Sequence, residues 1–180
     1  MWGESLMRLS DIEGFLVRRR VALGAAAVLI ALVFGEPTWP RWAVGLALAL
    51  VGEGLRVWAA GHLEKNREVT TSGPYRYMRH PLYNGSSLIA LGVMIASDNF
   101  VVSLLVLTYI LTTIPASIRA EEMHLRSTFG DLYDRYTKAE APGVERPFSF
   151  ERVMRNKEYR AVAGVAAGFA LLALKVRLLL

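Results

Sequence analysis

The sequence predicts an all-α, polytopic membrane protein, a bundle of about five transmembrane helices with a polar pocket on the cytoplasmic side. Hydrophobic residues make up 53% of the 180 residues, and the mean hydropathy of +0.32 is high for a soluble domain. The charged residues, 21% of the chain, fall in blocks that separate long apolar runs. Because lipid offers no hydrogen-bond partner to an open backbone, such runs must be helical where they cross a bilayer.

Five apolar runs approach the length of about 20 residues that a helix needs to cross the hydrocarbon core. They are residues 21–34, 42–60, 82–96, 100–118 and 161–180. The first run is short, and the last carries Lys175 and Arg177, whose charged ends would have to reach the interface. A cleaved signal peptide is an alternative interpretation of the first run. No small-residue cleavage site follows Phe34, so we expect a retained helix.

Basic residues orient the predicted bundle. The net charge is +5, and 17 of the 21 lysines and arginines fall in residues 1–20, 61–81 and 119–160, which share one side if all five runs span. The positive-inside rule therefore places the N-terminus and both polar segments in the cytoplasm, at the plasma (inner) membrane if the cell is prokaryotic. Topology and anionic lipid headgroups account for this charge, so we expect no nucleic acid partner.

Helical patterns extend beyond the five runs. Before the first run, apolar residues recur at helical spacing at Trp2, Leu6, Leu9, Ile12 and Leu16. This spacing predicts an amphipathic helix in residues 1–20 that lies on the membrane surface. The short polar turn at residues 97–99 predicts a tight hairpin of the third and fourth runs. After the fourth run the spacing continues, with an expected break at Gly130 and a second piece capped by Asp131.

Common cofactor and metal motifs are missing from the sequence. No phosphate-binding loop of the form Gly-x-x-x-x-Gly-Lys-Ser/Thr occurs, and Gly52-Glu53-Gly54 lacks the third glycine of a dinucleotide-binding motif. Cysteine is absent, which excludes disulfides, thiolate zinc sites and cysteine nucleophiles. Glu121-x-x-His124 has the spacing of di-iron helical bundles, but these need the motif twice. The sequence therefore predicts no metal site.

Cations, aromatic residues and two prolines are concentrated in residues 73–85, at the start of the third run. Pro81 suits the first turn of a helix, where its missing N–H has no cost. The helix N-terminus carries a partial positive charge, to which Arg79 and His80 add. We therefore expect an anionic group, such as a carboxylate or a phosphate, to bind here. An ordinary basic flank with interfacial tyrosines is the alternative, but the addition of Tyr83 favours a binding site.

Two pairs of ionisable residues are candidates by position. Glu121 and Glu122 lie where the fourth run meets water, and they either form a solvated helix start or face back into the hairpin. In the second position they would accept hydrogen bonds from an ammonium group or from hydroxyls. Glu53 and Arg56 lie three residues apart inside the second run. Ionisable residues in a span are functional candidates, and the structural alternative is that these two pair with each other.

Several of these residues form a pattern that resembles a known family. The pattern is Arg79-His80-Pro81-x-Tyr83-x-Gly85, six residues and then Gly92, followed after a membrane hairpin by Glu121-Glu122-x-x-Leu125. It is flanked by Thr71-Ser72-Gly73-Pro74-Tyr75 and by Phe129-Gly130-x-x-Tyr133-x-x-Tyr136. In this order the segments resemble the isoprenylcysteine carboxyl methyltransferase family, whose superfamily also contains phospholipid N-methyltransferases. The resemblance covers residues 56–150 of what we expect to be one domain, residues 1–180 with a terminal helix at 161–180.

The resemblance implies methyl transfer from S-adenosylmethionine, bound in a cytoplasmic cofactor pocket. The residues that it implies for cofactor binding are Tyr75, Arg79, His80, Pro81, Tyr83, Gly85, Glu121 and Glu122. The candidates for catalysis are Arg79, His80 and Glu122. A cationic helix start suits the cofactor carboxylate, glutamates suit its ammonium or ribose, and tyrosine faces suit its sulfonium. Gly85 would let the cofactor approach the backbone closely.

The acceptor that the resemblance implies is lipidic. A carboxylate of an isoprenoid-linked or other lipidic acceptor arrives ionised and needs no base, whereas an amine needs one, for which His80 or a glutamate is a candidate. A phospholipid N-methyltransferase is therefore the alternative function. A nicotinamide-dependent membrane reductase and a non-catalytic membrane protein are the alternatives from other classes. The acceptor would enter sideways between helices, and the cofactor would enter from the cytoplasm.

Overall fold

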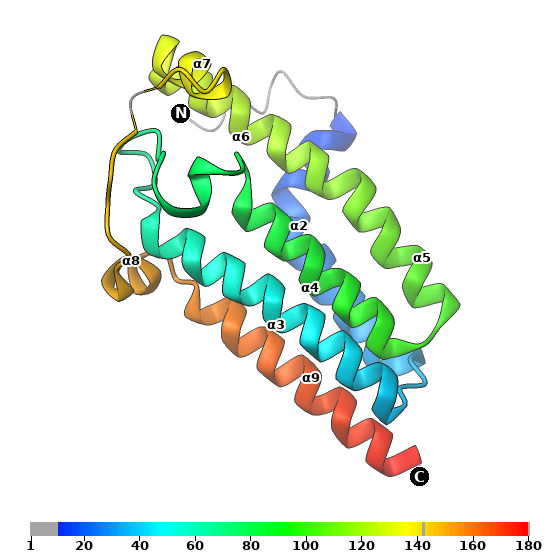
Figure 1. Cartoon of the computed structure of the whole chain (residues 1–180). Helices are drawn as coiled ribbons and strands as arrows, with labels where there is room; N and C mark the ends of the chain where they lie inside the picture. Colours follow the sequence, from blue (N-terminus) through cyan, green and yellow to red (C-terminus); the bar gives the residue numbers. More distant parts are fainter. Residues whose placement is uncertain (1–10, 142, 180) are drawn as a thin grey trace.

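The computed structural model describes residues 11–141 and 143–179, in which every regular element is a helix (Figure 1). In chain order the elements are α2 (Asp11–Phe34), α3 (Trp39–His62), η1 (Gly73–Arg76), α4 (Pro81–Ser97), α5 (Phe100–Thr108), η2 (Tyr109–Thr113), α6 (Ile114–Phe129), α7 (Asp131–Thr137), α8 (Phe150–Arg155) and α9 (Tyr159–Leu179). η1 is a 3-10 helix, and η2 is a π-helix. The predicted all-helical fold is therefore confirmed for the described residues.

Within this part of the chain, three helices are long and apolar enough to cross a membrane. They are α3, α9 and the continuous helix Phe100–Phe129, which α5, η2 and α6 form together. α4 is apolar but has only 17 residues. α2 contains Arg18, Arg19 and Arg20, so only its later part is free of charge. The three long helices are those of an integral membrane protein, and the total of five spans stays a prediction.

The segment before the first predicted run is continuous with that run. α2 begins at Asp11 and continues to Phe34, so residues 11–20 and the run 21–34 form one helix. The arginines between them are good helix formers and do not interrupt it. Residues 11–20 are therefore helical, as their spacing predicts, and they pack on α6 through the buried Val17, while their place on the membrane surface stays a prediction. The rest of that predicted helix, residues 1–10, lies outside the described residues.

α3 and α4 pack together at backbone distance because glycines face glycines. A Cβ atom added to Gly52 would meet the carbonyl oxygen of Gly85 at 2.6 Å, and one added to Gly92 would meet that of Gly45 at 2.5 Å. Ala49 lies between Gly45 and Gly52 on α3 and is fully buried. In each helix the two glycines are seven residues apart, which is about two turns. Small residues let membrane helices approach closely and gain van der Waals contact, since lipid provides no hydrophobic drive between them.

The hairpin of α4 and α5 has the predicted boundaries. Pro81 opens α4, and His80 is its N-cap residue. At the other end, a two-residue turn separates α4 from α5. The side-chain oxygen of Asn99 accepts hydrogen bonds from the second and third N–H groups of α5 at 3.0 and 3.2 Å. This capping satisfies donors that a helix start leaves open.

The helix after the hairpin continues past the fourth apolar run, as predicted. It runs on to Phe129 and carries both glutamates on α6. Gly130 then breaks the helix as predicted, with a φ of 49° that glycine adopts without strain. The prediction that Asp131 caps α7 is wrong, because Gly130 is the N-cap residue and no side chain caps this helix.

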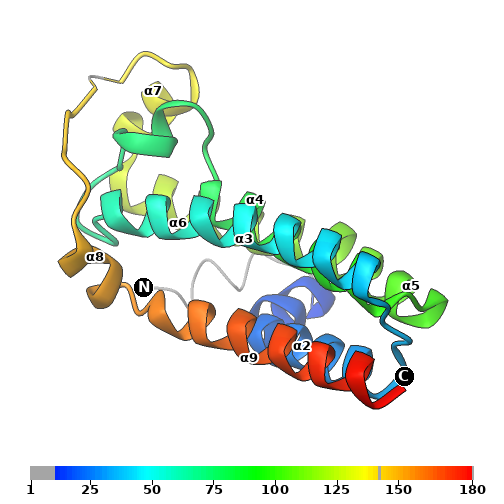
Figure 2. The same cartoon turned by 60° about the horizontal axis from the view of Figure 1, so that its bottom comes forward.

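The polar connections gather at one end of the bundle. Figures 1 and 2 show η1, the end of α6, α7 and α8 at this end, and the α4–α5 turn and the end of α9 at the opposite end. Residues 144–158 are fastened to the end of α3. Ser149 N–H and Arg152 Nε donate to the carbonyl oxygen of Gly61 at 3.1 and 2.7 Å, and Asn156 Nδ2 donates to two neighbouring carbonyls. These bonds satisfy carbonyl groups that a helix C-terminus leaves open.

Polar anchors hold α9 against the bundle. The indole N–H of Trp42 on α3 donates to the carbonyl oxygen of Phe169 at 2.9 Å. The ammonium group of Lys175 donates to the carbonyl oxygens of Leu32 and Val33 at 2.8 Å each. Lys175, predicted to extend to the interface, therefore caps the last turn of α2 instead. Figure 2 shows α2 and α9 on one side of the bundle, with α3 and α4 on the other.

Candidate active site

The two predicted motifs meet at the polar end of the bundle. His80 precedes α4, and Glu122 lies on α6, 42 residues later. His80 Nε2 is 2.9 Å from Glu122 Oε1, and Arg79 Nη1 is 3.5 Å from the same oxygen. The segment between η1 and α4 thus brings two side chains with N–H groups to one carboxylate. Of the two open interpretations of the glutamates, the structure supports the one in which they face back toward the hairpin.

Glu121 faces the aromatic side of the same region. Its side chain interacts with that of Tyr83, and its charge acts on the hydroxyl of Tyr75. The rings of Tyr83 and His80 are in edge contact, with centroids 6.2 Å apart. Six side chains from η1, α4 and α6 therefore surround one region, which we call the η1–α4 corner. They are Tyr75, Arg79, His80, Tyr83, Glu121 and Glu122.

Two tyrosines of α7 adjoin the corner. The Tyr136 hydroxyl donates to the carbonyl oxygen of Tyr75 at 2.8 Å and so fastens η1 to α7. Tyr133 is 1% exposed, and its hydroxyl makes no hydrogen bond to any residue that the structure describes. The guanidinium of Arg126 lies 5.8 Å from the centroid of the Tyr133 ring. Because buried polar groups are rarely left without a partner, the Tyr133 hydroxyl is a candidate donor to a ligand.

Burial keeps the tyrosine hydroxyls of this region protonated. It raises the pKa of Tyr75 and of Tyr133, and the nearby carboxylates of Glu121 and Glu122 raise these pKa values further. Burial also raises the pKa of Tyr136 to about 12. The three hydroxyls are therefore neutral donors near neutral pH, and none of them is available as a phenolate base.

The chemistry of the corner fits S-adenosylmethionine. The side chain of Arg79 is 52% exposed, so its guanidinium can turn from Glu122 toward a cofactor carboxylate. Glu121 and Glu122 are acceptors for an ammonium group or for ribose hydroxyls. The buried hydroxyl of Tyr133, which has no described partner, adds a donor that a polar ligand would satisfy. Anion-binding and cation-binding groups thus lie side by side, as a zwitterionic cofactor requires.

Two predicted cofactor-binding residues have evident structural roles. Pro81 is fully buried and begins α4. Gly85 faces α3, where an added Cβ atom would meet Cγ of Arg56 and the carbonyl oxygen of Gly52, each at 2.6 Å. Helix packing therefore gives a reason for the bare backbone of Gly85 that does not involve a cofactor. Cofactor contact by either residue stays a prediction.

Arg56 pairs with a residue that the sequence did not link to it. Its Nε donates to Oε1 of Glu158 at 2.6 Å, and its Nη1 donates to the Ser86 hydroxyl at 2.5 Å. The structural alternative, in which Arg56 and Glu53 pair with each other, is not found, since both carboxylate oxygens of the buried Glu53 lack a hydrogen-bond partner among the described residues. In the sequence, Glu158 is marked only by its position as a single acid just before the apolar run 161–180. Its partner lies 102 residues earlier and follows only from the packing of α9 on α3.

Arg20 and Tyr109 approach the corner from the membrane side. The charge of Arg20 acts on both Tyr83 and Tyr109, and the Tyr109 hydroxyl donates to the carbonyl oxygen of Arg20 at 3.5 Å. Tyr109 is the first residue of the π-helix η2, and π-helical turns are frequent at functional sites. The sequence analysis used Arg20 only as a topology signal, and no local pattern distinguishes η2 from an α-helix.

Comparison with known families identifies the chain. Residues 20–132 match the family model described as phospholipid methyltransferase, which is more than half of the chain. The chain belongs to the phospholipid methyltransferase family. The matched residues of this membrane methyltransferase include the η1–α4 corner, whereas α9 and Glu158 lie beyond them. No solved structure matches the chain.

Curated relatives of this member of the phospholipid methyltransferase family are named either as metal-resistance proteins or as isoprenylcysteine O-methyltransferases. The cobalt-zinc-cadmium resistance protein CzcN of Cupriavidus metallidurans is 32% identical over 148 residues, 73% of this chain and 67% of that protein. The nickel-cobalt-cadmium resistance protein NccN of Alcaligenes xylosoxydans xylosoxydans is 34% identical over 146 residues, 72% and 66% of the two chains. The protein-S-isoprenylcysteine O-methyltransferase of Schizosaccharomyces pombe is 34% identical over 98 residues, 54% and 42% of the two chains.

These relatives confirm the resemblance to isoprenylcysteine carboxyl methyltransferases. The chain spans about two thirds of the length of the two metal-resistance relatives and less than half of the yeast enzyme. In the described part of the chain, no group of three or more His, Asp and Glu side chains is placed to hold a metal ion.

Proposed function

We propose that the protein transfers a methyl group from S-adenosylmethionine to a carboxylate of an isoprenoid-linked or other lipidic acceptor at the membrane. The observation that carries this proposal is the contact of His80 with Glu122, which joins the two motifs of the family resemblance in one corner. Membership of a methyltransferase family and similarity to an isoprenylcysteine O-methyltransferase support it.

The η1–α4 corner binds the cofactor in this proposal. Arg79 receives the cofactor carboxylate, and Glu121 and Glu122 accept hydrogen bonds from its ammonium group and ribose. The ring of Tyr83 lies against the sulfonium, since aromatic faces attract cations by about 0.5–2 kcal/mol. His80 keeps its hydrogen bond to Glu122 and so fixes the direction of that carboxylate.

Positioning and the exclusion of water provide the catalysis. When bound, S-adenosylmethionine would supply an electrophilic methyl group on a sulfonium, which an oxygen of the acceptor carboxylate would take while the sulfur keeps the electron pair of the broken C–S bond. No proton moves, so the protein's own side chains act by holding the two partners in line. Because opposite charges cancel in this step, a corner with buried tyrosines and little water favours it.

The distribution of basic residues supports a cytoplasmic corner. The segments 61–81 and 119–160, which contain the corner, carry 13 of the 21 lysines and arginines. By the positive-inside rule, these segments and the N-terminus lie in the cytoplasm, and the protein lies in the inner membrane if the cell is prokaryotic.

A phospholipid N-methyltransferase is the second candidate function, and the description of the matching family favours it. An amine acceptor must lose a proton before it attacks the methyl group. His80, hydrogen-bonded to Glu122, would then act as the base. The two candidates therefore share a cofactor and a corner but differ in whether His80 moves a proton.

Binding of S-adenosylhomocysteine, measured by calorimetry on purified protein in detergent, tests cofactor use. We expect the wild type to bind and Glu122→Ala to bind at least about tenfold more weakly, because a hydrogen bond to a charged group contributes about 1.5–3 kcal/mol. Glu140→Ala removes an exposed acid at the same end of the bundle and should bind as the wild type does. A wild type that binds a nicotinamide cofactor instead would support a reductase, and one that binds neither would support a non-catalytic protein.

Methyl-labelled S-adenosylmethionine distinguishes the two acceptor classes in membranes that contain the protein. A label released by mild base is a methyl ester and supports the carboxylate acceptor. A label that resists base and migrates with phospholipid is an N-methyl group and supports the second candidate.

A further inference from the structure

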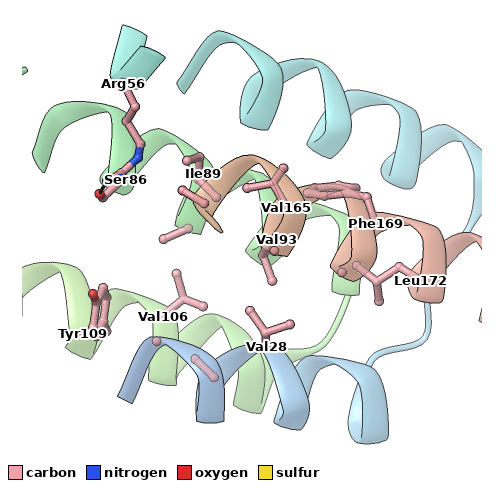
Figure 3. Close-up of a pocket in the computed structure, with 16 residues that line it drawn as sticks. Val28, Arg56, Ser86, Ile89, Val93, Val106, Tyr109, Val165, Phe169 and Leu172 are labelled. Carbon is pink, nitrogen blue, oxygen red and sulfur yellow. Dashed lines mark hydrogen bonds between the residues drawn. The ribbon is translucent and has the colours of Figure 1, made fainter. Parts of the chain in front are cut away.

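A cavity of about 290 Å³ lies in the apolar part of the bundle, between α2, α4, α5 and α9. Figure 3 shows aliphatic and aromatic side chains around most of it, with Arg56, Ser86 and Tyr109 toward one end. Ligand pockets range from about 300 to 1,000 Å³, so this cavity suits one apolar chain and not the two chains of a phospholipid.

α9 forms a large part of the cavity wall through small residues. Gly164 and Gly168 both line the cavity. A Cβ atom added to Gly164 would meet nothing within 4 Å, and one added to Gly168 would meet only Val28 Cγ1 at 3.6 Å. Helix packing therefore does not require a glycine at these two positions, whereas it does at Gly52 and Gly85, where α3 meets α4. Their bare backbone leaves space inside the cavity.

The polar end of the cavity carries one charged side chain, Arg56, among the described lining residues. Its Nε is held by Glu158 at 2.6 Å, and its Nη1 by Ser86 and by the carbonyl oxygen of Leu82 at 2.5 and 3.3 Å. Nη2 makes no hydrogen bond to any residue that the structure describes. No acidic side chain is among the described residues that line the cavity. Glu158 balances the charge of Arg56 from outside the cavity, and the N–H groups of Nη2 face no acid on the cavity wall, so this end favours an acceptor such as a carboxylate over a cation.

The polar end of the cavity adjoins the η1–α4 corner. Arg56 and Ser86 both donate to the carbonyl oxygen of Leu82, which lies between Pro81 and Tyr83 in the first turn of α4. Tyr109, at the same end, shares the neighbourhood of Arg20 with Tyr83. A molecule with its apolar chain in the cavity thus has its head close to the corner where the methyl donor is proposed to bind.

We propose that this cavity holds the single apolar chain of a lipidic carboxylate, with the carboxylate at Arg56, and that Gly164 and Gly168 of α9 determine which chains fit. The proposal rests on the proposed function for its role in methyl transfer, and it gives Gly164 and Gly168, which lie beyond the family match, a part in selecting the acceptor. Glu158 is a positioning residue here, because it holds Arg56 at the mouth of the cavity without lining it.

Filling the cavity tests the proposal. Gly164→Leu adds a side chain at an exposed glycine that lines the cavity, whereas Gly54→Leu adds the same side chain at an exposed glycine of α3 that does not line it. An added Cβ atom meets nothing within 4 Å at either position. A photoreactive 16-carbon carboxylate is cross-linked to each protein in nanodiscs, and the labelled peptides are mapped by mass spectrometry. We expect label on α2, α4 and α9 in the wild type and in Gly54→Leu, and about a tenfold loss in Gly164→Leu, as for a side chain that no longer fits its pocket.

Competition identifies the head group. Oleic acid, oleyl alcohol and oleylamine share one chain, and we expect the acid to displace the photoreactive probe at the lowest concentration. Equal labelling of Gly164→Leu and Gly54→Leu would overturn the cavity as the binding site, and stronger competition by the amine would overturn the role of Arg56.

Calorimetry with S-adenosylhomocysteine separates this proposal from the proposed function. Gly164→Leu should bind it as the wild type does, which also reports that the variant is folded. If Gly164→Leu does not fold, Gly164→Val takes its place in the same comparison. If the wild type is labelled by the carboxylate probe but does not bind S-adenosylhomocysteine, the proposed methyltransferase function fails and the lipid site stands. If it binds S-adenosylhomocysteine but is not labelled, only the lipid site fails.

Discussion

The η1–α4 corner and the α9 cavity adjoin each other but are built in different ways. The corner consists of polar side chains with short contacts, such as the 2.9 Å contact of His80 with Glu122, and it lies within the residues matched by the family model. The cavity consists of small and apolar side chains on four helices, and its α9 wall lies outside the match.

A membrane transferase has two structural requirements, and the two regions meet them separately. Chemistry on a small cofactor needs a few polar groups at fixed distances, and a short motif at a helix start can provide them. Selection of an apolar chain needs volume, which depends on where whole helices lie and on which positions have no side chain. A change in the corner should therefore affect the reaction with every acceptor, while a change in α9 should affect only some acceptors.

Removal of the charge of Glu122 should have the largest effect. Glu122→Gln keeps the size of the side chain but weakens the contacts with His80 and Arg79. We expect kcat/KM for methyl transfer to fall about 1,000-fold for long and short acceptors alike, as when a preorganised polar group at a reacting centre is lost. The rate of label transfer to a series of chain lengths measures this. Glu140→Gln should retain full activity, and a loss confined to long chains would contradict the division between corner and cavity.

The pair of Arg56 and Glu158 connects the two regions. Loss of this pair should have the next largest effect. Both side chains are largely buried, at 19% and 6% exposure, so Glu158→Gln leaves a charge without its partner. We expect about 3 kcal/mol of destabilisation, together with weaker labelling by the carboxylate probe. Thermal unfolding in detergent measures the first effect. Glu145→Gln breaks the exposed pair with Arg76 and should leave the stability nearly unchanged, because water screens the pair. Equal losses in the two variants would argue against a buried pair of Arg56 and Glu158.

The sequence predicted the corner because its signals are local. Pro81 marks the start of α4 within one residue of the predicted run, and the turn at Asp98 and Asn99 fixes a hairpin that returns the chain to the same end. Because the hairpin is antiparallel, its second helix returns Glu122 to the end of the bundle at which His80 lies. The extent of α6 was also predicted, because apolar residues such as Leu125 and Phe129 keep a helical spacing after the continuous apolar run ends, and Gly130 marks the break.

The cavity could not be predicted, because it depends on distances between segments far apart in the chain. The partner of Arg56 lies 102 residues away, and the mutual pair with Glu53 was the natural expectation from spacing alone. Gly85 and Gly164 look alike in the sequence, yet one is pressed against a backbone and the other faces open space. Only the three-dimensional arrangement distinguishes a glycine that packs from a glycine that makes room.

The glycine contact between α3 and α4 tests that distinction by stability. Gly52→Ala places a methyl group 2.6 Å from the carbonyl oxygen of Gly85, and we expect about 2 kcal/mol of destabilisation from overpacking. Gly54→Ala, two residues later on an open face, should instead stabilise the protein by about 0.5–1 kcal/mol, because alanine restricts the unfolded chain. Midpoints of thermal unfolding compare the two variants, and a stabilising Gly52→Ala would show that the helices are not in backbone contact.

Tyr136 should give the smallest effect, and one that depends on pH. Tyr136→Phe removes the 2.8 Å hydrogen bond to the carbonyl oxygen of Tyr75, which should cost about 1 kcal/mol at neutral pH. Since burial raises the pKa of Tyr136 from 10.0 to about 12, the folded state holds its proton more tightly than the unfolded state. That stabilisation is complete below pH 10 and is lost as the pH rises through 12, so the wild type should lose more stability over this interval than Tyr136→Phe. Tyr77→Phe, at a residue 74% exposed, should follow the wild type throughout, and parallel curves for all three proteins would mean that α7 does not fasten η1.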